Sequence, residues 1–423
     1  LRRRGEVRLR ALGRELLRHL LAPEQRVDVG VDLRDDGRGR ARRGEQPEPG
    51  IHVEAGHAGF RDGRDLVEGG GALGAYQAGV YQALSEAGYE PDWLAGISIG
   101  AINAAIIAGN PPKDRLARLQ HFWERVTAPM LPLSEFGEFN HQLFNRASAM
   151  AAVLFGASGF FRPRFPFALL QPQGTLGALS FYDTAPLRAT LEELIDFDLI
   201  NNPHAIRLSL GAVNIRSANF VYFDNCNRTL TVDHIMASAA RPPGFPPVAI
   251  EGEYFWDGGL VSNTPLSYLL ENGPHEDTLA FQVDLFSASG QMPRDIWEVG
   301  ERCKDIAYSS RTRLNTDHFR QKHRLRRAIA YLYERLPEAV KEQPEIKALR
   351  AEGEAHAVSI VHLIYRRKNY ENQSKDYEFS QASMREHWQA GLDDAHRTLR
   401  HQLWLKPVAA ELGVRVSDLA GVD

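Results

Sequence analysis

A serine flanked by glycines is the residue in this chain whose surroundings best suit nucleophilic chemistry. Ser98 lies in the stretch GISIG, residues 96–100, which follows the apolar segment PDWLA and runs into AINAAIIAG. In a G-x-S-x-G turn between a strand and a helix, the glycines permit a sharp turn that exposes the serine hydroxyl. The helix expected from Ile99 would also direct its positive N-terminal dipole at that hydroxyl. The alternative interpretation is a tight turn whose serine only caps the helix.

A glycine-rich stretch, GGGALG at residues 69–74, precedes this serine and permits two interpretations. It matches the G-x-G-x-x-G fingerprint of dinucleotide sites, which requires an acidic residue at the end of the following strand. That strand, DWLAG, leads into the serine turn and carries no carboxylate at its tip, which disfavours a nicotinamide-dependent enzyme. The other interpretation is an oxyanion hole, because consecutive glycines let backbone N–H groups approach a carbonyl oxygen without steric hindrance.

A base for the serine is harder to find, and one carboxylate stands out. Asp257, in YFWDGGLVSNTP, ends an aromatic strand and precedes Gly258 and Gly259. A partly desolvated carboxylate within hydrogen-bond reach can act as a general base, although Asp-Gly is also a common turn dipeptide. The chain has 15 histidines, and a triad is not excluded by their number. His234 lies in the apolar pattern VDHIMASAA, where we expect a structural role.

Taken together and in this order, the three stretches resemble the patatin-like phospholipase family over about residues 65–290. The segment HIMASAARPPGFPPV is also similar to the family's stretch between serine and aspartate. The resemblance implies that Ser98 is the nucleophile and Asp257 its only side-chain partner. It implies an oxyanion hole made by the backbone N–H groups of Gly70 and Gly71. The motif glycines would be Gly69, Gly74, Gly96, Gly100, Gly258 and Gly259.

Two positions depart from the family's commonest pattern. Many members carry Arg or Lys in the glycine loop where this chain has Leu73, and Gly259 replaces the alanine of the plant proteins, as in bacterial members. The stretch SMREHWQAGLDDAHRTL, residues 383–399, resembles an extension found in one bacterial subfamily. The resemblance supplies no role for that extension.

The expected fold is α/β, a patatin-like three-layer α/β/α arrangement with a mainly parallel central sheet and a mostly helical C-terminal region. The residue pattern from 65 to 108 supports it, since strand, glycine loop, helix, strand, serine turn and helix follow one another as in a parallel βαβ unit. Further strands are expected at AIRLSLGAVNI, FVYFDN, YFWDGG and TLAFQVDLF, and a helix at TVDHIMASAA.

Composition divides the chain into three parts. Residues 1–64 are rich in Arg, contain the Gly-, Pro- and charge-rich stretch RDDGRGRARRGEQPEPG, and have Phe60 as their only aromatic, which predicts a disordered segment or a start site placed too far upstream. Residues 65–290 are the expected catalytic domain. The cluster SASGQMP, residues 287–293, marks a predicted boundary, beyond which 291–423 form a helical extension.

Charge and cysteine content exclude several function classes. A net charge of -4 argues against general nucleic-acid binding. Cys226 and Cys303 cannot form a disulfide framework and show no metal-ligand spacing, which favours a reducing, cytoplasmic location. No apolar run is long enough to span a bilayer. The mechanism implied by the resemblance requires no metal and no other cofactor.

Two segments are candidates for peripheral membrane contact. Residues 149–170 are apolar and contain Phe155, Phe160, Phe161, Phe165 and Phe167. They could form a lid or acyl-chain wall that also touches a bilayer, or an insertion that fills the core. Residues 302–327 carry many more Lys and Arg than Asp and Glu, which suits either anionic lipid headgroups or a solvated helix face.

The sequence therefore favours a serine lipid acyl hydrolase that cleaves acyl esters of phospholipids or related lipids through a Ser-Asp dyad and an acyl-enzyme. An esterase, thioesterase or acyltransferase that uses another acyl donor shares the same chemistry. A different class, a non-catalytic membrane-associated protein, would need only a structural serine turn.

Overall fold

The computed structural model describes residues 63–67, 71–127, 148–262, 265–273, 276–353, 356–365, 379–401, 408 and 413–418. The chain divides into two compact units. The larger unit comprises 61–323 and 356–423, and the smaller one contains 324–355 together with residues before 61. The predicted N-terminal segment, residues 1–64, falls almost wholly outside the described residues.

The larger unit is built on a mainly parallel sheet, as predicted. Among the described residues its strand order is β11-β10-β9-β1-β2-β5-β8-β7, with β6 also paired to β5. The pairs from β11 through to β5 are parallel, whereas β6 and β8 pair with β5, and β7 with β8, in antiparallel fashion. The strands are β1 Gly63–Val67, β2 Pro91–Ile97, β5 Arg207–Asn214, β6 Phe220–Asp224, β7 Val248–Ile250, β8 Glu253–Asp257, β9 Thr278–Asp284, β10 Val358–Ile364 and β11 Val414–Asp418.

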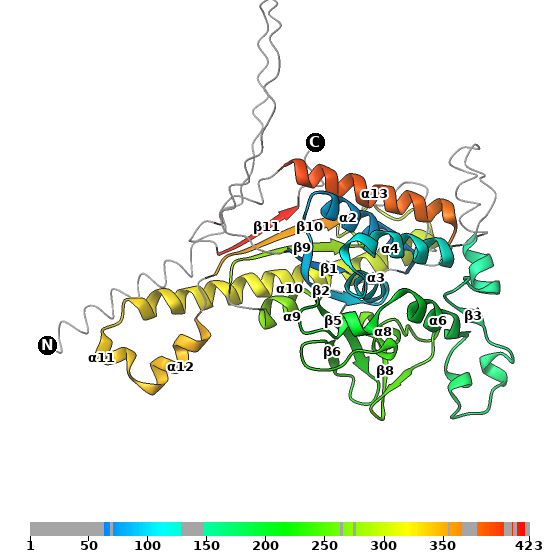
Figure 1. The fold of residues 1–423 in the computed structure, drawn as a ribbon, viewed down its shortest axis with the longest axis horizontal. Coiled ribbons are helices and arrows are strands. Elements are labelled where there is room, and N and C mark those ends of the chain that lie inside the picture. Colours follow the sequence, from blue (N-terminus) through cyan, green and yellow to red (C-terminus); the bar gives the residue numbers. More distant parts are fainter. Residues whose placement is uncertain are drawn as a thin grey trace, which may run out of the picture. The chain divides into compact units, whose positions relative to one another are not determined.

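Helices cover both faces of this sheet (Figure 1). On one face α3 packs against β2 so closely that a Cβ on Gly96 would lie 2.5 Å from the Gly100 carbonyl oxygen. The opposite face of β2 presents Trp93 and Ala95, because successive side chains of a strand point to opposite sides. These two residues share a buried apolar cluster with Leu269 of α9 and Phe319 of α10. The three-layer α/β/α prediction is therefore confirmed.

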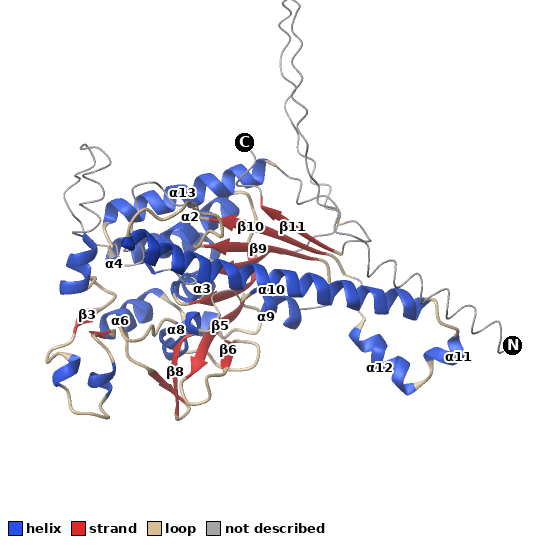
Figure 2. Cartoon of the chain, turned by 180° about the vertical axis from the view of Figure 1, so that it is seen from behind, coloured by secondary structure: helices blue, strands red, loops and turns tan. Residues whose placement is uncertain are grey.

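The remaining elements complete the two units, and Figure 2 distinguishes them by type. None of the helices in the part of the chain that the structure describes combines the length and apolarity needed to cross a bilayer. The helices are α2 Gly74–Glu86, α3 Ile99–Ala108, α4 Pro112–Val126, α6 Ala185–Leu194, α7 Phe197–Ile200, α8 Val232–Ser238, α9 Leu266–Asn272, α10 Ile296–Glu334, α11 Glu338–Lys341, α12 Pro344–Glu352 and α13 Gln381–Arg400; β3 Arg162–Pro163 and β4 Tyr182–Asp183 form a separate small sheet.

The C-terminal stretch that resembles a bacterial extension forms α13, which packs tightly on α2. A Cβ on Gly391 would lie 2.0 Å from the Tyr76 carbonyl oxygen, and one on Gly79 would lie 2.0 Å from that of Trp388. Trp388 Nε1 also donates a hydrogen bond of 2.7 Å to Gln82. Only glycine permits this approach, and α13 therefore supports the helix that follows the glycine loop.

The structure does not divide at the predicted boundary near residue 290. The region beyond it is mostly helical, as expected, but β10 and β11 extend the sheet from the edge of β9. The sequence VSIVHLI of β10 is buried along most of its length, as is usual for a parallel strand covered on both faces. The helices from 324 to 353 lie in the smaller unit, within the sequence interval between β9 and β10.

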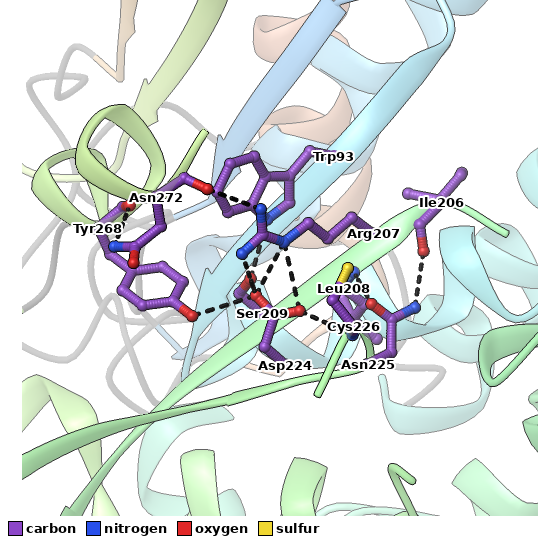
Figure 3. A network of polar contacts seen from close by, with 10 residues as sticks. All are labelled: Trp93, Ile206, Arg207, Leu208, Ser209, Asp224, Asn225, Cys226, Tyr268 and Asn272. Carbon is purple, nitrogen blue, oxygen red and sulfur yellow. Dashed lines mark hydrogen bonds and ion pairs between the residues drawn. The ribbon is translucent and has the colours of Figure 1, made fainter. Parts of the chain in front are cut away.

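A buried ion pair joins β2, β5, β6 and α9 at the end of β5 farthest from the serine turn (Figure 3). Arg207 pairs with the fully buried Asp224 at 2.9 Å, and its guanidinium carbon lies 3.6 Å from the centroid of the Trp93 ring. Ser209 and Tyr268 each donate a hydrogen bond to Asp224, at 2.7 Å and 3.1 Å. Because these groups come from four elements, the network fixes the register of the strands that carry the site.

Candidate active site

Ser98 occupies a strained turn between the end of β2 and the start of α3. Its backbone has φ 58° and ψ -126°, a positive φ that residues with a side chain adopt only at a cost. The close approach of Gly96 to Gly100 shows that these two positions have no room for a side chain. The predicted strand–serine turn–helix arrangement is therefore present.

A buried serine holds this turn in place. The backbone N–H of Ser98 donates to Ser238 Oγ at 3.2 Å, and that hydroxyl donates to the Gly211 carbonyl at 2.7 Å. Ser238 is fully buried at the end of α8. Sequence reasoning missed it, since a serine in the apolar run HIMASAA gives no signal until its partners are known.

The pairing of the strands brings Asp257 close to the Ser98 turn. In the parallel pairing of β2 with β5, Ile97 lies opposite Gly211, and in the antiparallel pairing of β5 with β8, Ala212 lies opposite Asp257. A Cβ on Gly258 would lie 2.7 Å from the Gly211 carbonyl oxygen and 3.1 Å from Ile97 Cγ2. Ser98, which follows Ile97, and Asp257, which precedes Gly258, therefore lie close together across β5.

Asp257 has a buried carboxyl, and two hydrogen bonds of this residue, one from its backbone and one to its side chain, fix its position beside the serine turn. Its backbone N–H donates to the Ala240 carbonyl at 3.0 Å, and Oδ1 accepts a hydrogen bond of 2.7 Å from the Gly259 N–H. Oδ2 is buried and has no hydrogen-bond partner among the described residues, so it can accept a hydrogen bond from a hydroxyl. The Ser98 hydroxyl lowers the pKa of this carboxyl, as a neighbouring hydrogen-bond donor does.

Opposing influences set the pKa of Asp257. Burial raises the pKa above the ordinary aspartate range and is the dominant influence. The positive charge of Arg241, the Ser98 hydroxyl and the Gly259 N–H each lower it. The Arg241 guanidinium donates to the Tyr308 hydroxyl of α10 and lies 5.8 Å from the centroid of that ring. Sequence reasoning missed Arg241, which lies in the loop between α8 and β7.

The glycine loop is described only in part. Gly69 and Gly70 lie outside the described residues, so only Gly71 of the two predicted oxyanion N–H donors is described. Gly71 has φ 56°, a left-handed conformation that glycine adopts without strain, and it begins the short turn leading into α2. Leu73, which stands where many family members have a basic residue, is fully buried.

A buried asparagine joins this loop to the serine helix. Asn103 of α3 donates from Nδ2 to the Gly74 carbonyl at 3.0 Å and to Gln77 Oε1 at 2.9 Å. Its Oδ1 accepts a hydrogen bond of 3.1 Å from Trp123 Nε1. A Cβ on Gly74 would lie 2.5 Å from Ile99 Cγ1, so α2 and α3 are in close contact at this point. Asn103 thus fixes the start of α2 relative to the helix that begins after Ser98.

His234 has the structural role that its apolar surroundings predict. The Thr231 N–H donates to His234 Nδ1 at 3.0 Å, which closes a capping box at the start of α8. Burial lowers the pKa of this imidazole and so favours its neutral form. His234 therefore stabilises the helix that ends in Ser238.

Comparison with known proteins assigns the chain to a family. A model described as Patatin-like phospholipase matches residues 66–270, which include Ser98 and Asp257, and one described as Patatin phospholipase matches residues 306–411. Together the two ranges cover more than half of the chain. The chain belongs to the patatin-like phospholipase family. The second range contains α13, in agreement with the resemblance predicted for residues 383–399.

Comparisons with individual proteins add little. No curated protein matches the chain. The crystal structure of VipD from Legionella pneumophila is similar to it at 15% sequence identity, over 77% of this chain and 67% of that one. The TM-score of this match is 0.31.

Proposed function

We propose that this patatin-like protein is a serine lipid acyl hydrolase that cleaves acyl ester bonds of phospholipids or related lipids through Ser98 and Asp257. Family membership supports lipid hydrolase activity. One observation carries the residue assignment: the pairing of β2, β5 and β8 brings Ser98, in a strand–helix turn with positive φ, beside the buried carboxyl of Asp257. A nucleophile and a base within reach of one another are the minimum for acyl transfer.

In the first half-reaction the Asp257 carboxylate accepts the hydroxyl proton while Ser98 Oγ attacks the acyl carbonyl carbon. The carbonyl π electrons move to oxygen, and the backbone N–H groups of Gly70 and Gly71, aided by the N-terminus of α3, stabilise this oxyanion. The oxyanion then collapses, the bond to the alcohol oxygen breaks, and the proton on Asp257 passes to the departing alcohol.

In the second half-reaction water takes the place of the alcohol. Asp257 accepts a proton from the water molecule, whose oxygen attacks the carbonyl carbon of the Ser98 ester. Collapse of the second oxyanion releases a carboxylic acid, and Ser98 Oγ recovers a proton from Asp257. A donor or acceptor of another type, such as a thioester or a second alcohol, would use the same steps.

Backbone strain favours an enzyme over a non-catalytic protein. Holding a serine at φ 58° costs about 1–3 kcal/mol, which a glycine at the same position would avoid. Ala218 and Glu251 have a similar positive φ in exposed turns, whereas Ser98 lies between a buried strand and a buried helix beside the buried Asp257.

A substrate panel tests this proposal. Phospholipid, lysophospholipid, acylglycerol and acyl-CoA are each incubated with the protein, and released acid is measured. We expect turnover of at least one lipid ester that Ser98→Ala abolishes, whereas Ser217→Ala, which alters an exposed serine in a turn, leaves it unchanged. Turnover that survives Ser98→Ala, or no turnover of any ester by folded protein, would contradict the proposal.

A further inference from the structure

Large apolar side chains gather on the surface of residues 148–181, here called the apolar segment. Phe165 and Leu169 are each 90% exposed and Phe155 is 79% exposed, and further leucines of the segment are also exposed. Figure 1 shows the segment around β3 at the edge of the larger unit, away from the central sheet. Exposed apolar patches of this kind are uncommon unless they contact a partner or a membrane.

The apolar segment is anchored to the rest of the larger unit at residues 159–161. Phe160 and Phe161 are buried and pack on Phe245, with ring centroids 5.9 Å and 5.4 Å away. The Thr190 hydroxyl of α6 also donates to the Gly159 carbonyl at 2.7 Å. The five phenylalanines noted in the sequence thus divide into two that fill a core and three that face outward.

The loop that holds the apolar segment also holds the active-site residues. The backbone N–H groups of Phe181 and Tyr182 donate to the carbonyls of Pro243 and Gly244, at 3.0 Å and 2.9 Å. A few residues earlier in the same loop, the Ala240 carbonyl accepts from the Asp257 N–H. The end of the apolar segment is therefore hydrogen-bonded to the loop that positions Asp257.

The charged residues of the apolar segment favour a lipid bilayer as its partner. It contains Arg162 and Arg164 and no Asp, Glu or Lys. Arg162 pairs with Asp183, just beyond the segment, at 2.8 Å but keeps 66% of its side chain exposed, and Arg164 donates to Ser180 at 2.9 Å. Arginines among exposed aromatic and aliphatic side chains match the anionic headgroup layer above the acyl chains of a bilayer. A second copy of the segment, facing the first across a two-fold axis, would place arginines together without an acidic residue of the segment between them.

The basic run at residues 302–327 is the other segment predicted to contact a membrane, and the structure gives less support for that contact. Arg302 donates to the carbonyls of Ser287 and Ala288, and Lys322 pairs with Glu271 at 2.9 Å. Arg302 and Lys322 therefore already have hydrogen-bond or ion-pair partners within the protein.

We propose that the apolar segment docks the protein onto a lipid bilayer, with its aromatic and aliphatic side chains entering the boundary between headgroups and acyl chains. Docking at this place extends the proposed function, because it would present ester bonds of the bilayer to the loop beside Ser98. It does not depend on catalysis, and the Ser98→Ala variant should dock as well as the unaltered protein.

Vesicle sedimentation with the full chain tests this. Vesicles of phosphatidylcholine and phosphatidylglycerol are mixed with the protein, and the bound fraction gives a partition coefficient. We expect the double variant Phe165→Ser/Leu169→Ser to lower it by at least about tenfold, since burying one large apolar side chain accounts for roughly that factor. Met292→Ser, which removes an exposed apolar side chain outside the segment, should leave it unchanged. Circular dichroism and thermal unfolding check that all variants fold alike.

The outcomes separate docking from catalysis. Vesicle binding by the double variant that equals that of the unaltered protein, or no binding by either, would overturn the docking proposal. Self-association that the double variant abolishes, without vesicle binding, would overturn it in favour of a second copy of the chain. A water-soluble short-chain ester reports on catalysis alone: if it and the lipid esters are not hydrolysed while vesicle binding follows the expected pattern, the proposed function fails and docking stands.

Discussion

Asp257 must be ionised to accept a proton, yet its burial favours the neutral acid. Arg241 is the charged group that opposes this effect, and Tyr308 holds its guanidinium. Activity should therefore fall as the pH drops through a pKa that lies above the ordinary aspartate range. At the residue scale, we therefore expect the working pH of the site to depend on Arg241, a cation outside the motifs.

Replacement of Arg241 tests this dependence. Arg241→Met removes the charge that lowers the pKa of Asp257, so the acidic limb of the kcat/KM profile should move to higher pH. Tyr308→Phe is the matched control, because it removes the hydroxyl partner and keeps the cation. A profile for Arg241→Met that coincides with that of the unaltered protein would show that this charge does not act on the general base.

At the scale of elements, two buried polar networks hold the site, and both escape sequence analysis. Asn103 and Ser238 lie within apolar helices, where a single polar residue predicts neither its partner nor its role. In contrast, the serine turn and the Asp-Gly-Gly element could be predicted, since their function depends on local glycine geometry. The sequence therefore suffices to propose the reacting groups, while the residues that position them depend on tertiary packing.

The substitution Asn103→Leu tests whether Asn103 positions the glycine loop for catalysis without affecting substrate binding. The substitution leaves the Gly74 carbonyl, Gln77 and Trp123 without this partner, at a cost of about 1–3 kcal/mol in the free energy of unfolding. Displacement of the glycine loop should lower kcat by roughly ten- to a hundredfold with little change in KM. Gln77→Leu keeps the bond to Gly74 and should have a smaller effect on kcat. A purely structural Asn103 would lower stability and leave kcat of the folded enzyme unchanged.

The Arg207–Asp224 pair makes a prediction about stability alone. Burial raises the pKa of Asp224, but the Arg207 guanidinium, the Cys226 N–H and the Ser209 hydroxyl outweigh it and hold the pKa below the ordinary range. A lowered pKa stabilises the fold above the pKa of the unfolded chain, and this stabilisation is lost as the pH falls through the folded value.

Asp224→Asn should therefore cost about 3–5 kcal/mol at neutral pH, because it leaves the half-buried Arg207 without its charge partner. Its penalty should shrink on acidification, as the unaltered protein loses the same stabilisation. Glu253→Gln breaks an exposed pair with Arg216 and should cost no more than about 1 kcal/mol. Chemical unfolding at several pH values measures both, and a small penalty for Asp224→Asn would contradict the role assigned to this pair.

At the scale of the whole molecule, the order of the three motifs was sufficient to predict the family and the α/β layers. The place of β10 and β11 was not predictable in the same way. Both are short strands near charged helices, and β10 joins the sheet through β9, far earlier in the sequence, while β11 joins it through β10. Non-local strand pairing leaves no local pattern, which explains why the sequence alone did not predict that β10 and β11 extend this sheet.

Truncation after residue 290 tests this arrangement. The shortened chain would expose the edge of β9 and the α2 surface that α13 covers. We expect loss of cooperative thermal unfolding and a large fall in soluble yield. A truncated chain that unfolds cooperatively at the same temperature as the full chain would show that residues 65–290 are an independent domain.

The central claim is that Ser98 reacts and that Asp257 activates it. The most direct measurement is the rate at which a fluorophosphonate modifies the folded protein, with the adduct located by peptide mass spectrometry. The account predicts a single adduct on Ser98, formed at least about a hundredfold more slowly in Asp257→Asn. An adduct on another residue, no adduct on folded protein, or equal rates in the two proteins would contradict it.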